Sequence, residues 1–273
     1  MKRLLTLTGL SVIFLLSCQK EVNVDLDGTA NNGGLLVQIG SKTDADTTTT
    51  TFGYNSSKKL VTIKTEGMSG GQSVSNSQRL IRNSQGVVTS IISKSPGLSQ
   101  YGLDSLITVV HSDASGKYTS QVTTIDLILL VIRDSVALVY SGTNVSKEVE
   151  YIDDGTGYSE FGKTEFTYSG NNVSSVKVSL VDDNGGYETE YILNYTYDDK
   201  VSPLILGNEG LAFGFTTWFS ANNIIKADLQ VPSDPTQNVT ITKTYTYNAA
   251  KKPLTAISVE PGGSSTRDIY TYQ

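Results

Sequence analysis

Tyr245-Thr246-Tyr247-Asn248, followed by Pro253-Leu254-Thr255-Ala256-Ile257, is the stretch that decides the fold. In a β-strand, residues two positions apart lie on the same face, so the two tyrosines share one face and Thr246 takes the other. Tyr and Thr both favour strands, whereas Asn after the second tyrosine favours a turn. We therefore interpret this stretch as a strand, a polar turn and a returning strand.

The same arrangement recurs along the chain. The residue that ends such a strand, which we call an anchor, stands at nine positions: Tyr54, Arg82, His111, Tyr140, Tyr168, Tyr197, Phe219, Tyr247 and Tyr272. The distances between successive anchors are 28, 29, 29, 28, 29, 22, 28 and 25 residues. A nearly constant period indicates a structural repeat, and two strands with their turns fill about 28 residues. Each repeat is therefore predicted to be one β-hairpin.

The repeats predict an all-β protein, an antiparallel meander of repeated hairpins that forms one curled sheet or open barrel. Residues 52–273 are assigned to this β-repeat domain, and the repeats are clearest over 165–273. The strand near Tyr270, at the chain end, could leave an open edge that pairs with a partner.

Three stretches depart from the simple pattern. Residues 68–77 are rich in Gly and Ser and are interpreted as a long hairpin loop. The apolar stretch 125–140 is interrupted by Arg133-Asp134-Ser135 and is interpreted as two strands joined by a tight turn at that point, both buried on two faces. A buried helix is the alternative there, although the β-branched residues favour strands. Residues 203–217 form a longer connection, either a flap or a short helix.

Residues 1–17 resemble a signal peptide, with a basic start and a short apolar stretch. That stretch is too short for a membrane span, which needs about 20 apolar residues. Leu15-Leu16-Ser17-Cys18 resembles a lipobox, in which Cys18 receives a diacylglyceryl group and becomes the first residue of the mature chain. Cys18 is the only cysteine in 273 residues, which favours lipidation over an ordinary secretory signal with an incidental cysteine.

Residues 18–51 are assigned to the lipidated cysteine and a flexible tether, with Leu35–Ile39 as a first strand inside it. Gln19, Lys20 and Glu21 resemble the short export tag that carries Bacteroidota-type lipoproteins to the outer face of the outer membrane; a solvated tether is the alternative. Together these features predict a lipid-anchored outer-membrane protein, at the cell surface rather than on the periplasmic face.

The Tyr-x-Tyr-Asp/Asn repeats resemble the tyrosine–aspartate (YD-like) β-repeats of secreted bacterial proteins. Tyr195–Lys200, Pro203-Leu204 and Ser220–Ile224 are similar to a family of uncharacterised Bacteroidota-type lipoproteins, over roughly residues 165–257. Val201-Ser202 departs from the Asn that this family's pattern places before the proline. The function of the family is unknown, so the resemblance implies no catalytic or binding residue.

The composition argues against several function classes. A net charge of −6 argues against nucleic-acid binding, which uses clustered Lys and Arg. His111 is the only histidine available as the base of a hydrolytic triad. Gly67-Met68-Ser69-Gly70-Gly71 matches the Gly-x-Ser-x-Gly elbow, but that elbow needs a strand before the serine and a helix after it. Both His111 and Ser69 are therefore interpreted as turn residues.

No cofactor or metal is predicted. One histidine and one lipidated cysteine cannot furnish a zinc site. Three acidic clusters could offer oxygen ligands to calcium, but none fits a calcium loop, and turn formation explains them better: Asp44 with Asp46, Asp153-Asp154 and Asp182-Asp183-Asn184. Glu188 and Glu190 flank Thr189 as a carboxylate pair, for which a solvated strand face is the commoner role.

The repeated aromatic residues are the main candidate site. Aligned through successive hairpins, eight of them would form a ladder: Phe166, Tyr168, Tyr195, Tyr197, Tyr245, Tyr247, Tyr270 and Tyr272. An exposed ladder would be a platform for sugars or peptides, whereas a buried one would be cross-strand packing worth about 0.2–1 kcal/mol per pair. Repetition along the chain favours packing.

The sequence as a whole predicts a non-enzymatic surface lipoprotein that binds a glycan, a peptide or an envelope protein. The alternative is a periplasm-facing carrier whose curled sheet holds a lipid or another hydrophobic ligand. A carboxylate-based hydrolase is the least favoured hypothesis.

Overall fold

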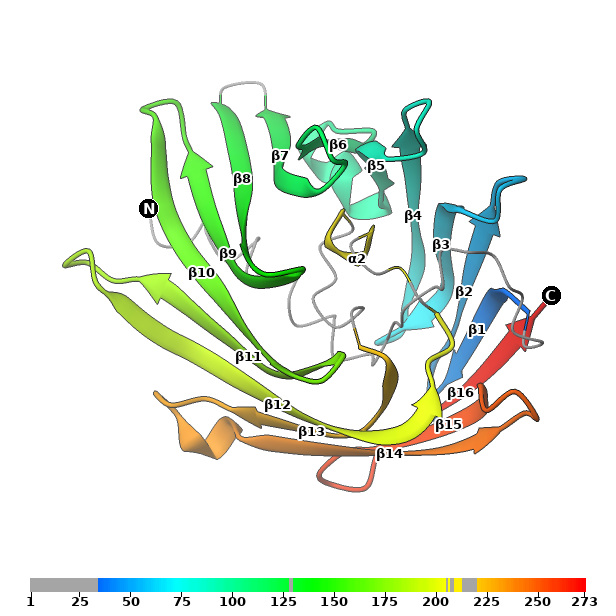
Figure 1. The fold of residues 1–273 in the computed structure, drawn as a ribbon. Helices are drawn as coiled ribbons and strands as arrows, with labels where there is room; N and C mark the ends of the chain where they lie inside the picture. Colours follow the sequence, from blue (N-terminus) through cyan, green and yellow to red (C-terminus); the bar gives the residue numbers. More distant parts are fainter. Residues whose placement is uncertain (1–33, 128–129, 205, 207–208, 213–219) are drawn as a thin grey trace.

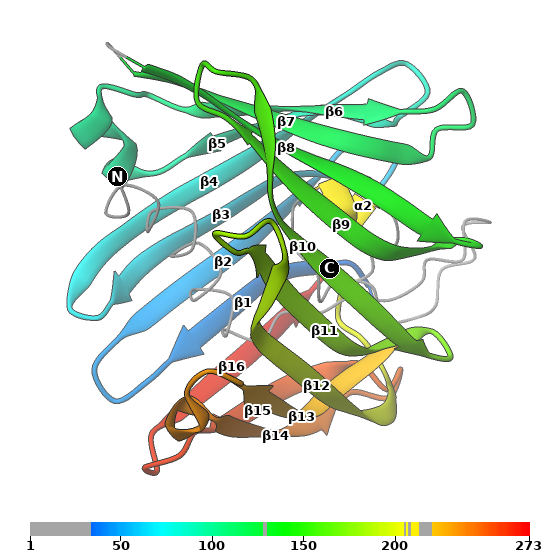
Figure 2. The same cartoon turned by 90° about the vertical axis from the view of Figure 1, so that its left-hand side faces the viewer.

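The computed structural model describes residues 34–127, 130–204, 206, 209–212 and 220–273. In these residues sixteen strands follow one another as an antiparallel meander, and the last pairs with the first to close a barrel (Figure 1). Figure 2 shows the strands crossing the barrel wall at a slant. The strands are β1 (Leu36–Lys42), β2 (Thr47–Tyr54), β3 (Leu60–Ser69), β4 (Gln72–Arg82), β5 (Val88–Lys94), β6 (Leu106–Ser112), β7 (Tyr118–Leu127), β8 (Leu130–Ser141), β9 (Asn144–Asp153), β10 (Tyr158–Ser169), β11 (Asn172–Val181), β12 (Tyr187–Val201), β13 (Asn222–Gln230), β14 (Val239–Tyr247), β15 (Pro253–Val259) and β16 (Ser265–Tyr272).

Three short helices accompany the strands in the described residues. They are the 3-10 helices η2 (Pro96–Tyr101) and η3 (Pro235–Gln237) and the one-turn helix α2 (Glu209–Ala212). No helix in the described part of the chain has the length and apolarity of a membrane span.

The predicted all-β antiparallel meander is confirmed, and its sheet is closed. β1 pairs with β16 along its whole length, from Leu36 to Lys42. The open edge expected near Tyr270 was therefore wrong, because the first and last strands satisfy each other's backbone groups. The barrel begins at Leu36, where a first strand was expected, inside the stretch 18–51 that was assigned to the tether.

Each repeat is one hairpin, and the anchors stand at or near the ends of even-numbered strands, from Tyr54 on β2 to Tyr272 on β16. These ends share one rim of the barrel with the beginnings of the odd-numbered strands, and we call it the tyrosine rim. The anchor Phe219 lies outside the described residues. The anchors Tyr197 on β12 and Tyr247 on β14 are separated by more than one period, because residues 202–221 form a long connection between β12 and β13.

Two predicted loops were wrong. Residues 68–77 belong to β3 and β4, joined by Gly70 and Gly71, whose φ angles of 59° and 72° suit a tight two-residue hairpin turn. Arg133-Asp134-Ser135 lies inside β8, where Arg133 pairs with Asp153 of β9. The apolar stretch is not buried on both faces either, because Leu138 is buried while Val139 is 42% exposed. Charges fit within this strand because successive residues alternate between the two faces of the barrel wall.

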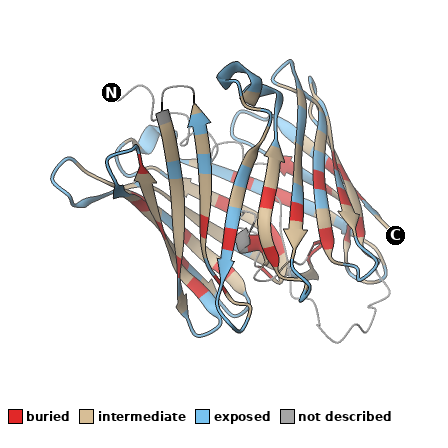
Figure 3. Ribbon diagram, turned by 90° about the horizontal axis from the view of Figure 1, so that it is seen from above, coloured by how far each residue is buried: buried red, intermediate tan, exposed pale blue. Residues whose placement is uncertain are grey.

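An apolar ring lines the inside of the barrel at the tyrosine rim. Each of the eight odd-numbered strands contributes a nearly inaccessible residue at or near its beginning: Leu36, Leu60, Val88, Tyr118, Val145, Val173, Ile224 and Pro253. Figure 3 shows the buried positions alternating with exposed ones along the strands. The hydrophobic core of this protein is therefore the inside of the barrel rather than a layer between two sheets.

The outer face of the wall differs in polarity from strand to strand. On β14, the outward residues Thr240, Thr242, Thr244 and Thr246 are all exposed, and they alternate with inward residues such as the buried Ile241. On β3 the outward residues are Thr62, Lys64, Glu66 and Met68. On β3 and β14 the alternation is thus mainly apolar toward the inside and polar toward the outside. β6, β15 and β16 also carry apolar residues on their outer faces, namely Ile107, Val109, Ile257, Val259 and Ile269, each 41–51% exposed.

Both ends of the barrel sequence lie at the tyrosine rim. The backbone groups of Leu35 and Gln273 exchange hydrogen bonds of 2.9 and 3.0 Å, and Lys252 Nζ donates to the Gly34 carbonyl at 2.7 Å. Gly34, the first described residue, therefore lies at this rim beside Gln273.

Candidate functional site

The predicted aromatic ladder lies on the inner side of the tyrosine rim. Phe166 and Tyr270 are buried, and the other six members are partly buried. Within a strand the rings are close neighbours: the ring centroids of Tyr245 and Tyr247 lie 5.9 Å apart, in a stacked arrangement. The structure thus brings the predicted residues together as an inner belt of the barrel, not as an outward platform.

The tyrosine hydroxyls of this belt bind backbone. On six even-numbered strands, a Tyr Oη donates to a carbonyl near the start of the preceding strand: Tyr54 to Leu36, Tyr140 to Tyr118, Tyr168 to Val145, Tyr197 to Val173, Tyr245 to Ile224 and Tyr272 to Pro253, at 2.6–3.0 Å. Each bond satisfies a backbone acceptor at the end of the strand ladder. Sequence reasoning named Tyr54 and Tyr140 as anchors but left them out of the ladder, although the same period marks them.

Burial keeps these hydroxyls protonated. Burial raises the pKa of Tyr140 to about 12, and it likewise raises the pKa of Tyr168, Tyr197 and Tyr272 well above the ordinary value. The hydroxyls therefore remain hydrogen-bond donors at neutral pH.

Tyr168→Phe is expected to lower the free energy of unfolding by about 1 kcal/mol, because the Val145 carbonyl loses its partner while the ring stays in place. Urea unfolding of the variant beside wild type measures the change. Tyr158→Phe is the matched control, since Tyr158 on the same strand is 52% exposed. Its substitution should leave the free energy of unfolding nearly unchanged. Equal effects of the two substitutions would contradict a stabilising role for the belt.

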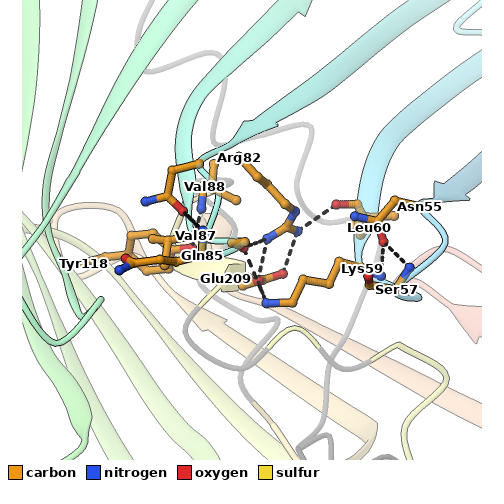
Figure 4. Close-up of polar contacts among 12 residues, drawn as sticks. Asn55, Ser57, Lys59, Leu60, Arg82, Gln85, Val87, Val88, Tyr118 and Glu209 are labelled. Carbon is orange, nitrogen blue, oxygen red and sulfur yellow. Dashed lines mark hydrogen bonds and ion pairs between the residues drawn. The ribbon is translucent and has the colours of Figure 1, made fainter.

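Arg82 takes the place of the tyrosine at the end of β4. Its Nη2 donates to the Leu60 carbonyl at 2.7 Å, just as the tyrosines donate to the preceding strand. Its Nη1 donates to the Gly86 carbonyl at 2.8 Å. The guanidinium also holds the Glu209 carboxylate with both nitrogens, at 2.6 and 2.8 Å (Figure 4). Arg82 therefore extends the belt and binds a carboxylate at the same time.

Glu209 belongs to α2, in the connection between β12 and β13. Figure 1 shows α2 inside the ring of strands, and α2 contacts β5 and β7 on the side opposite its own attachment. In the same connection, Leu204 is buried and Leu206 packs against the core. A sixteen-stranded barrel is too wide for wall side chains alone to fill. The described part of the connection thus helps to fill the barrel at the tyrosine rim.

A buried polar cluster fixes the two ends of this connection. Asp198 accepts hydrogen bonds from the backbone N–H and the side-chain amide of Asn223, at 2.9 and 3.1 Å, and from the Tyr247 hydroxyl. Ser220 Oγ accepts from the Val173 N–H at 3.1 Å and bonds the Tyr197 hydroxyl at 2.8 Å. These residues carry the resemblance noted in the sequence, and the geometry gives them a structural role.

Three carboxyl groups face the inside of the barrel on β8 and β9. Glu148 and Glu150 stand opposite the inward residues Leu138 and Val136, and Asp134 stands opposite Ile152. Burial raises the pKa of Glu148 and of Glu150 to about 7, and each is raised further by a neighbouring carboxylate. Burial also raises the pKa of Asp134 to about 6. Sequence reasoning did not single out these residues, because an acid at alternate strand positions is usually a solvated one.

The other residues weighed in the sequence do not converge on a site. His111 is exposed near the end of β6, and Ser69 ends β3 beside a hairpin turn, without the helix that an elbow needs. Glu190 occupies a register shift between β11 and β12, whereas Glu188 is exposed near the opposite rim. Within the described ranges, no three His, Cys, Asp or Glu side chains group closely enough to hold a metal ion. Cys18, like the tag that follows it, lies outside the described residues.

No protein-family model and no curated sequence matches the chain. Among solved structures, a porin-like protein from Bacteroides uniformis covers 87% of this chain and 98% of its own length, with 13% identity and a TM-score of 0.55. A porin-like protein from Bacteroides vulgatus covers 88% and 99%, with 9% identity and a TM-score of 0.56. At these identities the likeness shows a shared β-barrel fold.

Proposed function

We propose that this chain is a non-enzymatic, lipid-anchored envelope protein whose barrel stands in water beside the bilayer and works as a binding module. The observation that carries the proposal is the polarity of the outward faces of β3 and β14, together with the apolar residues on the inside. A barrel that spans a membrane presents an apolar band about 25 Å tall to the lipid, and its inside is polar. Here the outward faces of β3 and β14 are threonines and charged residues apart from Met68, while the buried hydrophobic side chains line the inside.

The N-terminal anchor fits a water-facing barrel. A barrel that does not insert by its own wall needs another attachment to reach the membrane, and acyl chains on Cys18 would supply it. The tether would reach the barrel at the tyrosine rim, beside Gln273. The export tag at Gln19, Lys20 and Glu21 favours the cell surface. We also propose that the chain belongs to the YD-like lipoproteins that its repeats resemble.

A carrier of a hydrophobic ligand is the second candidate, and one observation favours it. The apolar ring and Leu204 place hydrophobic side chains inside a closed barrel, where a lipid tail would be sheltered from water. In this case the barrel would face the periplasm.

Fractionation of cells tests the attachment. Residues 19–273 exported behind an ordinary cleavable signal are expected to appear in the soluble fraction, whereas the full chain stays with the membrane. The reason is that the hydroxyl and charged side chains on outward faces such as those of β3 and β14 oppose insertion of the wall into lipid once Cys18 is missing. Retention of residues 19–273 in washed membranes would show that the wall itself inserts, and would overturn the proposal.

Protease treatment of intact cells tests the side of the membrane. Wild type is expected to be digested, and a variant with Ala at residues 19–21 is expected to be protected until the outer membrane is opened. Protection of both proteins would favour the periplasmic carrier.

A further inference from the structure

We propose that Arg82 and Lys59 form a carboxylate-binding site inside the barrel, that Glu209 is its occupant within the chain, and that its external ligand is a monocarboxylate with an apolar tail. This inference rests on the proposed role as a binding module, for which it names the ligand class. It concerns binding to the purified protein, so its failure is separable from a failure of the anchoring proposal.

The departure from the repeat at Arg82 is the first observation. Six other even-numbered strands place a tyrosine at this rim, and the tyrosine hydroxyl is enough to satisfy the neighbouring backbone carbonyl. An arginine makes the same bond to Leu60 and adds a fixed fork of donors that matches a carboxylate. The chain therefore places a carboxylate receptor where the fold requires only a hydroxyl.

The geometry of the contact is that of a built site. Only 7% of the Arg82 side chain is exposed, and its four Nη hydrogens go to the carbonyls of Leu60 and Gly86 and to the two oxygens of Glu209. Its fifth donor, Nε, is buried without a hydrogen-bond partner among the described residues. Two carbonyls thus orient the guanidinium, and one buried donor is left for a further acceptor.

The local charge exceeds what Glu209 can neutralise. Lys59 Nζ lies 4.0 Å from Glu209 Oε1 and also donates to the Gly86 carbonyl, at 3.4 Å (Figure 4). One carboxylate therefore faces two cations, in a protein whose overall charge is −6. An anion is favoured at this point even though the molecule as a whole repels anions.

The surroundings determine the rest of the ligand. Leu60, Val88 and Tyr118 of the apolar ring lie around Arg82 and Glu209, and each is 3% exposed or less. Leu206, three residues before Glu209, packs against the same core. The connection thus presents a carboxylate together with apolar side chains, and a ligand that replaces these groups needs the same two parts.

Isothermal titration with octanoate tests the proposal on the full chain, with octanamide as the neutral isostere. Glu209→Gln is expected to bind octanoate at least ten-fold more tightly than wild type, because the competitor within the chain has lost its charge. Adding Arg82→Gln to this variant is expected to abolish the gain. Octanamide should bind weakly and equally to all three proteins. Glu66→Gln removes a carboxylate that pairs with Lys64 on the outer wall, and it should leave the wild-type affinity unchanged.

A second variant covers the case in which Glu209→Gln does not fold, because it leaves the buried Arg82 without its counter-ion. Glu209→Asp keeps the charge but shortens the side chain, so octanoate should still bind more tightly than it does to wild type. Octanoate binding that is no tighter in either variant, or that survives the loss of Arg82, would overturn the proposal.

Discussion

Asp268→Asn is expected to lower the free energy of unfolding by about 3–5 kcal/mol, as when one partner of a buried ion pair is removed. Lys243 Nζ lies 2.6 Å from Asp268 Oδ2, and only 2% and 8% of the two side chains are exposed. Ser41 Oγ donates to the other carboxylate oxygen at 2.7 Å. Asparagine would leave the Lys243 charge inside the barrel without this counter-ion. Urea unfolding at pH 7 measures the loss.

Two further variants separate the charge effect from a packing effect. Lys243→Met combined with Asp268→Leu removes both charges and keeps a similar volume, so most of the loss should be recovered. Glu66→Gln breaks the exposed pair with Lys64, 2.8 Å apart, and should change stability by less than about 1 kcal/mol. If Asp268→Asn cost no more than Glu66→Gln, the pair would not behave as a buried one.

The hairpins could be predicted because every repeat meets the same local requirement. A strand end needs a donor for the first carbonyl of its neighbour, and a tyrosine at a fixed position supplies it, as Tyr168 does for Val145. The requirement returns once per hairpin, so it appears in the sequence as a period. Closure could not be predicted in this way, because it depends on pairing between β1 and β16, at opposite ends of the chain.

The turn predicted at Arg133-Asp134-Ser135 shows where local reasoning fails. A charged triplet inside an apolar stretch suggests a break, but here the wall of a barrel accepts charge on either face. Arg133 meets Asp153 on the outer face at 2.9 Å, and Asp134 points inward. The partner of Arg133 is on another strand, so nothing within the triplet reveals it.

The contact between Arg82 and Glu209 could not be predicted from the sequence for a similar reason. Arg82 and Glu209 are 127 residues apart, and Glu209 lies in a connection without a repeat pattern. The one local signal was the arginine itself, which stands at an anchor position where tyrosine is usual. A residue that departs from the repeat in this way indicates a role other than forming the next hairpin.

The protein is expected to lose stability as pH rises from 5 to 8, by roughly 3–6 kcal/mol if the coupled interior acids titrate together. The pKa of Glu148 and of Glu150 rises from the ordinary 4.5 to about 7, and that of Asp134 from 3.8 to about 6. The folded state therefore holds these protons more tightly than the unfolded chain. The stabilisation is complete below about pH 4 and is lost as pH rises through the folded values.

Other titrating groups do not cancel this trend. The tyrosines that face the acids keep their protons, since burial raises the pKa of Tyr140 and of Tyr191 to about 12. Exposed aspartates such as Asp113 and Asp234 have a lowered pKa through hydrogen bonds from neighbouring side chains. Their contribution to stability is lost only when pH falls below their ordinary value of 3.8, outside the window.

Urea unfolding at pH 5, 6, 7 and 8 measures this dependence in wild type and in Glu148→Gln with Glu150→Gln. The double variant cannot titrate at these positions, so its stability should change much less with pH. Glu165→Gln is the matched control, because Glu165 lies on the outer wall with Lys163 at 3.4 Å, and it should keep the wild-type slope. A wild-type stability that rises from pH 5 to 8, or a double variant with the wild-type slope, would show that the interior acids ionise as they do in water. The inside of the barrel would then have to be far wetter around β8 and β9 than the burial of these side chains indicates.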